Sequence, residues 1–220
     1  MYPKTRIPLP PQYQAIYQEH IQANRSGQGL AHKLTLILEQ WMHRIVAQRA
    51  NPSDSILEIG SGNLNHIKFE EFAYYDVIEP NPALFLADES RARRIRQRFS
   101  GLDEIKESSY QRIFSIAVLE HVDDLPALID GVRPLLLPGG VFQVAIPTEG
   151  GLLWAAASKL KGFFFKRRYG LDYGVLMAYE HINTEAEIVG LVRERFDRVK
   201  VRRFPTPFKH LSLYTYLEAF

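Results

Sequence analysis

Cysteine is absent from this chain of 220 residues. Its absence excludes disulfide bonds, thiolate zinc sites and a cysteine nucleophile within the sequence. Metal ligands would have to be histidine, aspartate or glutamate. The seven histidines are scattered without the close spacing of a ligand set, so we expect no metal site.

Long apolar runs and a strong net charge are also absent. No stretch approaches the roughly 18 apolar residues that a membrane-spanning helix needs. The formal net charge is only +2, which gives no support for a nucleic-acid partner. The proline-broken start, MYPKTRIPLPPQYQ, lacks the apolar core of a secretory signal. We therefore expect a cytoplasmic protein without integral membrane contact.

The composition that is present is that of a globular protein, with 46% hydrophobic and 24% charged residues. A Pro-rich arm over residues 1 to 12 precedes two helices. From Ser55 onward, short apolar runs alternate with helical stretches, which is typical of βαβ units in a parallel sheet. Asn81 and Pro82 mark one helix start, and Thr184 with Glu187 marks another as a capping box. The predicted strands cover 55–59, 75–79, 112–118, 140–146, 197–204 and 211–219, the last two as an antiparallel pair.

A glycine turn follows the first predicted strand, at Gly60-Ser61-Gly62. Glycines let a backbone pass close to a ligand, and the helix expected after the turn would present free N–H groups. Nineteen residues after Gly60, the next apolar run ends at Glu79. A carboxylate at the carboxyl end of the neighbouring strand can accept two hydrogen bonds from the vicinal hydroxyls of a ribose. The pair of features predicts a nucleoside-bearing cofactor.

Several runs in this order resemble the class I S-adenosylmethionine-dependent methyltransferases, in particular the small-molecule branch of methyltransferase types 11 and 23. The resemblance covers most of residues 55 to 200. It implies an α/β fold with a Rossmann-like, doubly wound, mostly parallel seven-stranded sheet, helices on both faces and an antiparallel strand at one edge. The runs that carry it are Glu58–Gly62, Val77–Asn81, Phe114–Val122, Leu135–Gly140 and Glu180–Thr184.

The resemblance also implies S-adenosyl-L-methionine as cofactor, S-adenosyl-L-homocysteine as product and a role for each matching position. One departure is Leu64, where the family often has a third glycine. The implied contacts are Glu58, Gly60, Ser61 and Gly62 with the methionine part, Glu79 and the adjoining Pro80 with the ribose, Leu102 and Asp103 with the adenine, and Ala117, Val118 and Leu119 with the methyl group.

The expected layout is one methyltransferase domain over 1–220. An N-terminal arm and helical cap would cover 1–50, the cofactor-binding core 51–149, an insertion 150–183, and a C-terminal helix with closing strands 184–220. The partner is expected to be a small molecule, and a homodimer is left open. By analogy with the family, the leading acceptor is an oxygen of a sugar or secondary metabolite.

Two other functions fit parts of the pattern. An NAD-dependent oxidoreductase could use the same turn, but Glu58 would repel a pyrophosphate there. The fourth strand also leads into Leu-Glu-His-Val rather than a Tyr-x-x-x-Lys pair. A non-catalytic, regulatory protein that binds S-adenosylmethionine is the second alternative.

His121 is the candidate catalytic residue, because it follows the fourth strand and an imidazole can accept a proton near neutral pH. The competing interpretation is that it only packs or hydrogen-bonds near the cofactor. His181 also has a functional and a structural interpretation: it could face the substrate, or it could tie the insertion to the strand ends. His66 is expected on a helix near the cofactor.

Two basic segments remain. The arginines between positions 91 and 98 are interpreted as the solvated face of a helix rather than a phosphate-binding surface. The insertion joins aromatic to basic residues, notably from Phe163 to Arg168. We interpret it as a substrate lid, with contact to a membrane surface or partner as the alternative.

Overall fold

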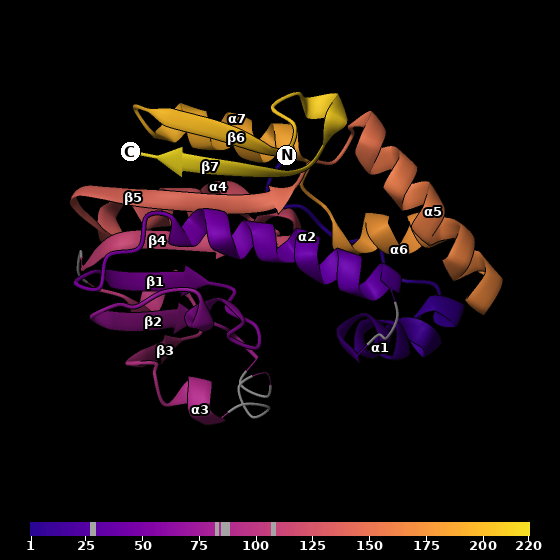
Figure 1. Cartoon of the computed structure of the whole chain (residues 1–220), viewed down its shortest axis with the longest axis horizontal. Coiled ribbons are helices and arrows are strands. Elements are labelled where there is room, and N and C mark those ends of the chain that lie inside the picture. The colour runs from indigo at the N-terminus through magenta and orange to yellow at the C-terminus, as the bar shows by residue number, and fades with distance from the viewer. Residues whose placement is uncertain (27–29, 82–83, 85–88, 107–108) are drawn as a thin grey trace.

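The structure is a computed structural model that describes residues 1–220 except 27–29, 82–83, 85–88 and 107–108, and except the side chains of residues 18 and 20–37. One seven-stranded sheet runs through the molecule in the order β3-β2-β1-β4-β5-β7-β6 (Figure 1). The strands are β1 Ser55–Ile59, β2 Tyr74–Ile78, β3 Gln97–Phe99, β4 Tyr110–Ile116, β5 Leu136–Pro147, β6 Val199–Pro205 and β7 Ser212–Ala219.

The first five strands are parallel, and β7 pairs antiparallel with both β5 and β6. The predicted fold class and the antiparallel closing pair are therefore confirmed. The strand β3 was not predicted, because Gln-Arg-Phe is short and carries no apolar alternation. The strand β5 begins at Leu136, four residues earlier than position 140, because Pro138-Gly139-Gly140 lies within the strand rather than before it.

Side chains of the strands alternate between two faces, and each face has its own core. On one face, Met42, Ile45 and Val46 of α2 (Leu30–Ala47) pack on Ile56 and Phe114. The other face is covered by α4 (Leu125–Val132) and α7 (Glu185–Arg195). Helices on both faces of the sheet were predicted, and the capping box of Thr184 with Glu187 does begin α7.

The connection from β1 to β2 differs from the prediction. In place of a full α-helix after the glycine turn, the described chain forms turns and the 3₁₀ helix His66–Lys68. His66 lies in that 3₁₀ helix, fully buried. The short helix α3 (Glu89–Ala92) precedes β3. A helix start was predicted at Asn81 and Pro82. Pro82 and most of the residues up to 88 lie outside the described part of the chain, so this prediction stays untested.

The segment 150–183 forms two helices, α5 (Leu152–Tyr169) and α6 (Tyr173–Glu180). Together with α1 (Pro11–Ser26) they lie beyond the carboxyl ends of the parallel strands (Figure 1). A third core joins them, in which Phe165 and Leu176 pack with Leu9 and Tyr13. The Tyr13 hydroxyl donates to the Asp172 carbonyl at 3.0 Å. The N-terminal arm and the insertion therefore form one layer over the strand ends.

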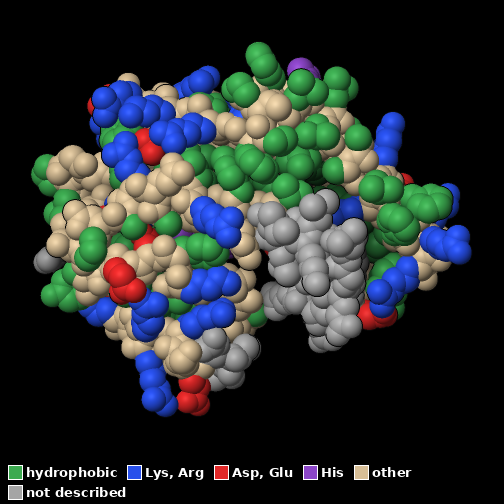
Figure 2. All heavy atoms as spheres, viewed as in Figure 1, with side chains coloured by type: hydrophobic (Ala, Val, Ile, Leu, Met, Phe, Trp, Pro, Cys, Tyr) green, Lys and Arg blue, Asp and Glu red, His purple; other side chains and the backbone are tan. Residues whose placement is uncertain are grey.

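The outer surface of α5 combines apolar and basic side chains, which gather at that end of the molecule (Figure 2). Leu160, Phe163 and Phe164 are each more than half exposed, whereas Phe165 is buried. Among the helices that the structure describes, none is both long enough and apolar enough to cross a bilayer.

Candidate active site

The glycine turn leaves β1 at Ile59 and bends through two left-handed residues. Gly60 has φ +73° and Gly62 has φ +52°, a region that side chains rarely adopt. The Gly60 N–H donates to the Ile78 carbonyl at 2.8 Å, which ties the turn to β2. A Cβ on Gly60 would lie 2.7 Å from Cγ1 of Val118 and closer still to Cγ2. The turn therefore passes directly against the residue that follows β4.

Leu64 occupies the position where the resemblance expected a third glycine. It also adopts a left-handed conformation, with φ +59°, and its side chain is buried in the core beneath α2. Burial of this leucine offsets a backbone strain of about 1–2 kcal/mol. The turn thus keeps a left-handed backbone at this position without a glycine.

Glu79 joins the turn to the end of β2. Its Oε2 accepts a hydrogen bond from the Gly62 N–H at 2.9 Å, and its Oε1 accepts one from the Asn81 N–H at 2.9 Å. The side chain is buried, whereas the adjoining Pro80 is exposed. Each carboxylate oxygen has two lone pairs, so each retains one for a further donor. The structure brings Glu79 and the glycine turn together, as the sequence predicted.

Glu58 makes a contact that the sequence did not predict. Its carboxyl group is buried and accepts a hydrogen bond from the Tyr75 hydroxyl at 2.6 Å. Burial raises the pKa of Glu58 to about 8, although the Tyr75 hydrogen bond lowers it. The carboxyl group is therefore largely protonated at pH 7, and a neighbouring ammonium group would draw it toward the charged form.

Ser61 has a hydroxyl that lacks a hydrogen-bond partner. The residue is 6% exposed, and its Oγ has no partner within the described part of the chain. A buried hydroxyl without a partner is costly, by about 1–3 kcal/mol. Its place between the two glycines makes it available to a polar ligand in the turn.

The end of β4 supplies three predicted residues. Ala117 has φ +55° and donates its N–H to the Ala145 carbonyl at 2.8 Å. Val118 lies against Gly60, so this residue is brought to the glycine turn, whereas Ala117 packs at the edge of the core beneath α2. The side chain of Leu119 is instead fully buried in the core that α4 and α7 cover. Leu119 is therefore a packing residue in this structure.

Leu102 and Asp103 follow β3 on the same sheet edge. Both belong to the 3₁₀ helix Leu102–Glu104, and β3 is tied to β2 because the Glu79 N–H donates to the Phe99 carbonyl at 3.0 Å. The two residues line an open groove of about 620 Å³ that extends along α4 to Gly131 and Leu135. The structure shows no contact between this pair and the glycine turn.

His121 lies at the mouth of the strand ends, in the 3₁₀ helix Leu119–His121. Its Nδ1 lies 2.7 Å from the Glu180 carbonyl oxygen, which marks Nδ1 as the protonated nitrogen and leaves Nε2 as an acceptor. Burial lowers the pKa of His121 to about 4, despite that hydrogen bond. The ring is therefore neutral at pH 7.

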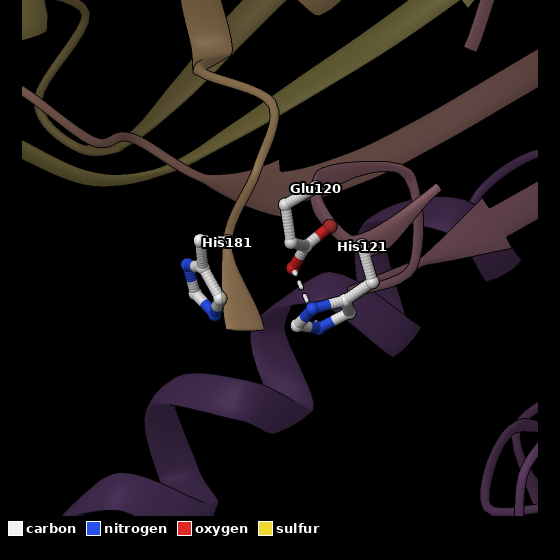
Figure 3. A group of neighbouring side chains, drawn as sticks. All are labelled: Glu120, His121 and His181. Atoms are coloured by element: carbon white, nitrogen blue, oxygen red, sulfur yellow. Dashed lines mark ion pairs between the residues drawn. The ribbon is translucent and has the colours of Figure 1, made fainter. Parts of the chain in front are cut away.

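His181 and the carboxyl group of Glu120 lie next to His121, and Glu149 pairs with the far side of His181. The His181 ring meets the His121 ring edge to face at 4.8 Å between centroids, and its Nδ1 pairs with Glu149. The carboxyl group of Glu120 lies between the two imidazole rings in the view of Figure 3. Glu120 is 2% exposed, and burial raises its pKa to about 7. Its Oε2 has no hydrogen-bond partner among the described residues.

The sequence interpretation missed Glu120 and Glu149 and separated His121 from His181. Fifty-nine residues lie between the two histidines, and only the packing of α6 against the strand ends brings them together. Asn183 holds this arrangement, because its Nδ2 donates to the carbonyls of Leu119 and Val122 at 2.9 and 2.6 Å. His181 thus ties the insertion to the strand ends and also faces His121.

The remaining candidates have structural contacts. His66 is buried under α2, where it lies 3.2 Å from His43 and 2.7 Å from Glu70, and it does not line the glycine turn. Arg96 pairs with Asp76, and Arg94 donates to the Ile67 carbonyl at 2.9 Å. These arginines therefore tie the segment before β3 to β2 and to the β1–β2 connection. The predicted helix face over 91–98 was wrong, because α3 already ends at Ala92.

A family model described as "Methyltransferase domain" matches residues 30–215. Known structures with the same architecture are related only distantly in sequence. An S-adenosylmethionine-dependent methyltransferase from Thermotoga maritima, described as a possible histamine N-methyltransferase, is 13% identical with a TM-score of 0.61, and the match covers 94% of this chain and 97% of that one.

The 1,6-didemethyltoxoflavin-N1-methyltransferase of Burkholderia thailandensis was crystallised with its substrate and S-adenosylhomocysteine. It is 15% identical with a TM-score of 0.58, and the match covers 98% of this chain and 92% of that one. No curated protein matches the chain significantly. Because the family model spans far more than half of the sequence, the chain belongs to the methyltransferase-domain family.

Proposed function

We propose that the protein transfers a methyl group from S-adenosyl-L-methionine to a small-molecule acceptor. The observation that carries the proposal is the hydrogen bond from the Gly62 N–H to Glu79, which joins the ends of β1 and β2 into one binding site. In open α/β sheets, ligands bind in the crevice outside the carboxyl ends of the strands. Glu79 retains one acceptor lone pair on each oxygen for the two ribose hydroxyls.

The methionine part of the cofactor fits the glycine turn. The backbone at Gly60 and Gly62 carries no side chain that would block a ligand, and the Ser61 hydroxyl lacks a partner among the residues that the structure describes. A carboxylate ligand could accept from that hydroxyl and from free backbone N–H groups. Glu58 lies behind the turn, where an ammonium group would favour its charged form.

The cofactor supplies a sulfonium-bound methyl group, and the protein supplies position. Methyl transfer is an in-line displacement, so holding the acceptor atom in line with the methyl group accounts for much of the rate. His121 is the side chain that we propose to act on the acceptor, through its free Nε2. The leading acceptor is an oxygen of a sugar or secondary metabolite, since an O–H group can hydrogen-bond to that nitrogen.

The segment 150–183 is proposed to cover the acceptor. Its C-terminal end lies at His121, through the Glu180 carbonyl and the ring of His181, and Glu149, which precedes the segment, pairs with His181. The buried aromatic side of α5 and α6 packs with the N-terminal arm beyond the strand ends. A layer in this position would exclude water from the transfer step.

Calorimetric titration with S-adenosylhomocysteine tests the cofactor site. The unmodified protein is expected to bind one molecule per chain, and Glu79→Gln is expected to bind at least about tenfold more weakly, because a hydrogen bond to a charged acceptor is lost. Glu71→Gln is the matched control, since Glu71 is 80% exposed and lies away from the turn. Equal affinity in Glu79→Gln and the unmodified protein would refute the ribose assignment.

Transfer from methyl-labelled cofactor separates the enzyme from its alternatives. A panel of hydroxyl, amine and carbon acceptors is expected to yield a labelled product with at least one member. Binding of S-adenosylhomocysteine without turnover on any acceptor would favour the regulatory protein. Binding of NAD in its place would favour the oxidoreductase.

A further inference from the structure

We propose that Glu120, His121 and His181 bind one divalent first-row transition-metal ion beside the methyl-acceptor site. The position beside the acceptor rests on the proposed function, whereas binding of the ion itself does not. Sequence spacing did not predict this site, because the histidines are sixty positions apart. The fold brings the potential ligand atoms of all three side chains within 4.8 Å of one another (Figure 3).

Both histidines are oriented as metal ligands are. Nδ1 of His121 lies 2.7 Å from the Glu180 carbonyl oxygen, and Nδ1 of His181 pairs with Glu149. Each Nε2 is thereby left with a lone pair. Metal-binding histidines commonly donate their other N–H to a carbonyl or a carboxylate, which fixes the tautomer and the ring orientation. The structure contains both kinds of support, one for each ring.

Glu120 supplies the independent observation. Its side chain is 97% buried, and its Oε2 has no hydrogen-bond partner in the described part of the chain. Burying an unpaired carboxylate costs several kcal/mol in a protein interior, and its other oxygen lies 4.0 Å from Nε2 of His121. A bound cation would give this carboxylate the partner that the protein does not provide.

Backbone hydrogen bonds fix the positions of the three side chains relative to one another. The N–H groups of Ile182 and Asn183 both donate to the Glu120 carbonyl, at 2.9 and 3.1 Å. The segment after α6 is therefore fixed to the segment after β4. An ion centred among three atoms at most 4.8 Å apart would lie at most about 2.8 Å from each. Shifts of roughly 0.7 Å per side chain would give the bonds of about 2.1 Å that zinc forms with nitrogen and oxygen.

The donor set indicates the class of ion. Two imidazoles and one carboxylate suit Mn²⁺, Fe²⁺, Co²⁺ or Zn²⁺ and leave coordination positions for other ligands. With the ion bound, the Nε2 of His121 is a metal ligand, so His121 acts on the acceptor through the ion rather than by a direct hydrogen bond. An acceptor hydroxyl bound at such a position would lose its proton more readily, because the ion stabilises the alkoxide. The O–H bond would break with release of the proton to solvent. The oxygen would then form the O–CH₃ bond while the S–CH₃ electron pair returns to sulfur.

Titration of the metal-stripped protein with Co²⁺ tests the site without any turnover. We expect one Co²⁺ per chain by calorimetry, together with the visible absorption of a histidine-ligated ion. Glu120→Gln and His181→Gln should each weaken Co²⁺ binding at least about tenfold. His210→Gln is the control, because His210 is an exposed histidine outside the cluster, and it should leave the affinity unchanged.

Binding of S-adenosylhomocysteine by the same variants reports whether they are folded. If the unmodified protein binds S-adenosylhomocysteine but no Co²⁺, the metal proposal is wrong and the proposed function stands. If Co²⁺ binds and S-adenosylhomocysteine does not, the metal site stands and the proposed function fails. Undiminished Co²⁺ binding by folded Glu120→Gln and His181→Gln would also overturn the assignment.

Discussion

Gly60 must be glycine for two independent reasons. Its φ of +73° is strained for any residue with a Cβ, and Val118 fills the space that a Cβ would take. Gly62 has only the first reason, since no atom in the described part of the chain lies within 4 Å of the place a Cβ would take. The two glycines of one turn are therefore held by different constraints.

Gly60→Ala should destabilise the protein by about 2–4 kcal/mol, because backbone strain and steric overlap add. Urea unfolding measures the change in the free energy of unfolding. Adding Val118→Ala to this variant should recover the steric part, since the clashing methyl groups are removed. A Gly60→Ala protein as stable as the unmodified one would contradict the close approach.

Gly190→Ala is the matched control for that experiment. Gly190 lies inside α7, its φ is not positive, and no atom lies within 4 Å of the added Cβ. The substitution should stabilise the protein by up to about 1 kcal/mol, through helix propensity. If alanine lowers the free energy of unfolding at Gly60 and raises it at Gly190, the loss at Gly60 comes from the strain and overlap at that position and not from any glycine-to-alanine change.

At the residue scale, local sequence patterns predicted the residues that meet at the glycine turn better than those that meet around His121. The glycine turn and Glu79 each follow an apolar strand, so parallel pairing alone brings them to one edge. Glu120 and Glu149 carry no local signal, because their partners come from segments far along the chain. Leu119 was predicted in the site since it follows β4, yet the 3₁₀ turn directs its side chain into the core.

At the scale of elements, α2 contacts the β1–β2 connection through buried polar groups. His43 of α2 lies 3.2 Å from His66, nitrogen to nitrogen, and His66 lies 2.7 Å from Glu70. The pattern fits a His43 N–H that donates to His66 and a His66 N–H that donates to Glu70. Arg112 of β4 completes the ion pair with Glu70. In this pattern His66 must be neutral, because its Nδ1 accepts the hydrogen bond, and burial lowers the pKa of both histidines.

This contact makes stability depend on pH. Burial, with the neighbouring charges of His66 and Lys68, lowers the pKa of His43 from 6.5 to about 3. The unfolded chain therefore takes up a proton first as the pH falls. Stability is fully present above pH 6.5 and is lost progressively as the pH falls toward 3. At pH 5, His43 should account for a loss of about 1–2 kcal/mol.

Urea unfolding at pH 7.5 and pH 5 checks this expectation. His43→Gln keeps an N–H donor for His66 but does not titrate, so its loss of stability over this range should be smaller by about 1–2 kcal/mol. His210→Gln removes an exposed histidine and should behave like the unmodified protein. An identical pH dependence of stability in all three proteins would show that protonation of His43 does not contribute to it.

Helices and strands were predicted correctly where the hydrophobic periodicity and the capping residues were clear. The prediction failed where contacts with distant segments determine the local structure. The capping box of Thr184 and the antiparallel pair β6 and β7 were predicted, and both form. The strand β3 forms because β2 offers it a pairing edge, which a three-residue polar segment cannot signal alone. The expected helix after the glycine turn is replaced by turns and a 3₁₀ helix that bury His66.

At the scale of the whole molecule, the resemblance stated from the sequence is confirmed by the family match. The sheet order places the ends of β1, β2 and β4 side by side, which is where the glycine turn, Glu79 and His121 lie. The layer of α1, α5 and α6 lies beyond the same strand ends (Figure 1). Under the proposed function, cofactor and acceptor would share one site between the sheet and that layer.

A crystal structure with S-adenosylhomocysteine is the most direct measurement of that central claim. We expect both ribose hydroxyls within hydrogen-bond distance of Glu79, with the amino-acid part along Gly60–Gly62 and the sulfur facing His121. A nucleoside bound elsewhere, for example in the groove beside Leu102 and Gly131 with Glu79 untouched, would contradict it.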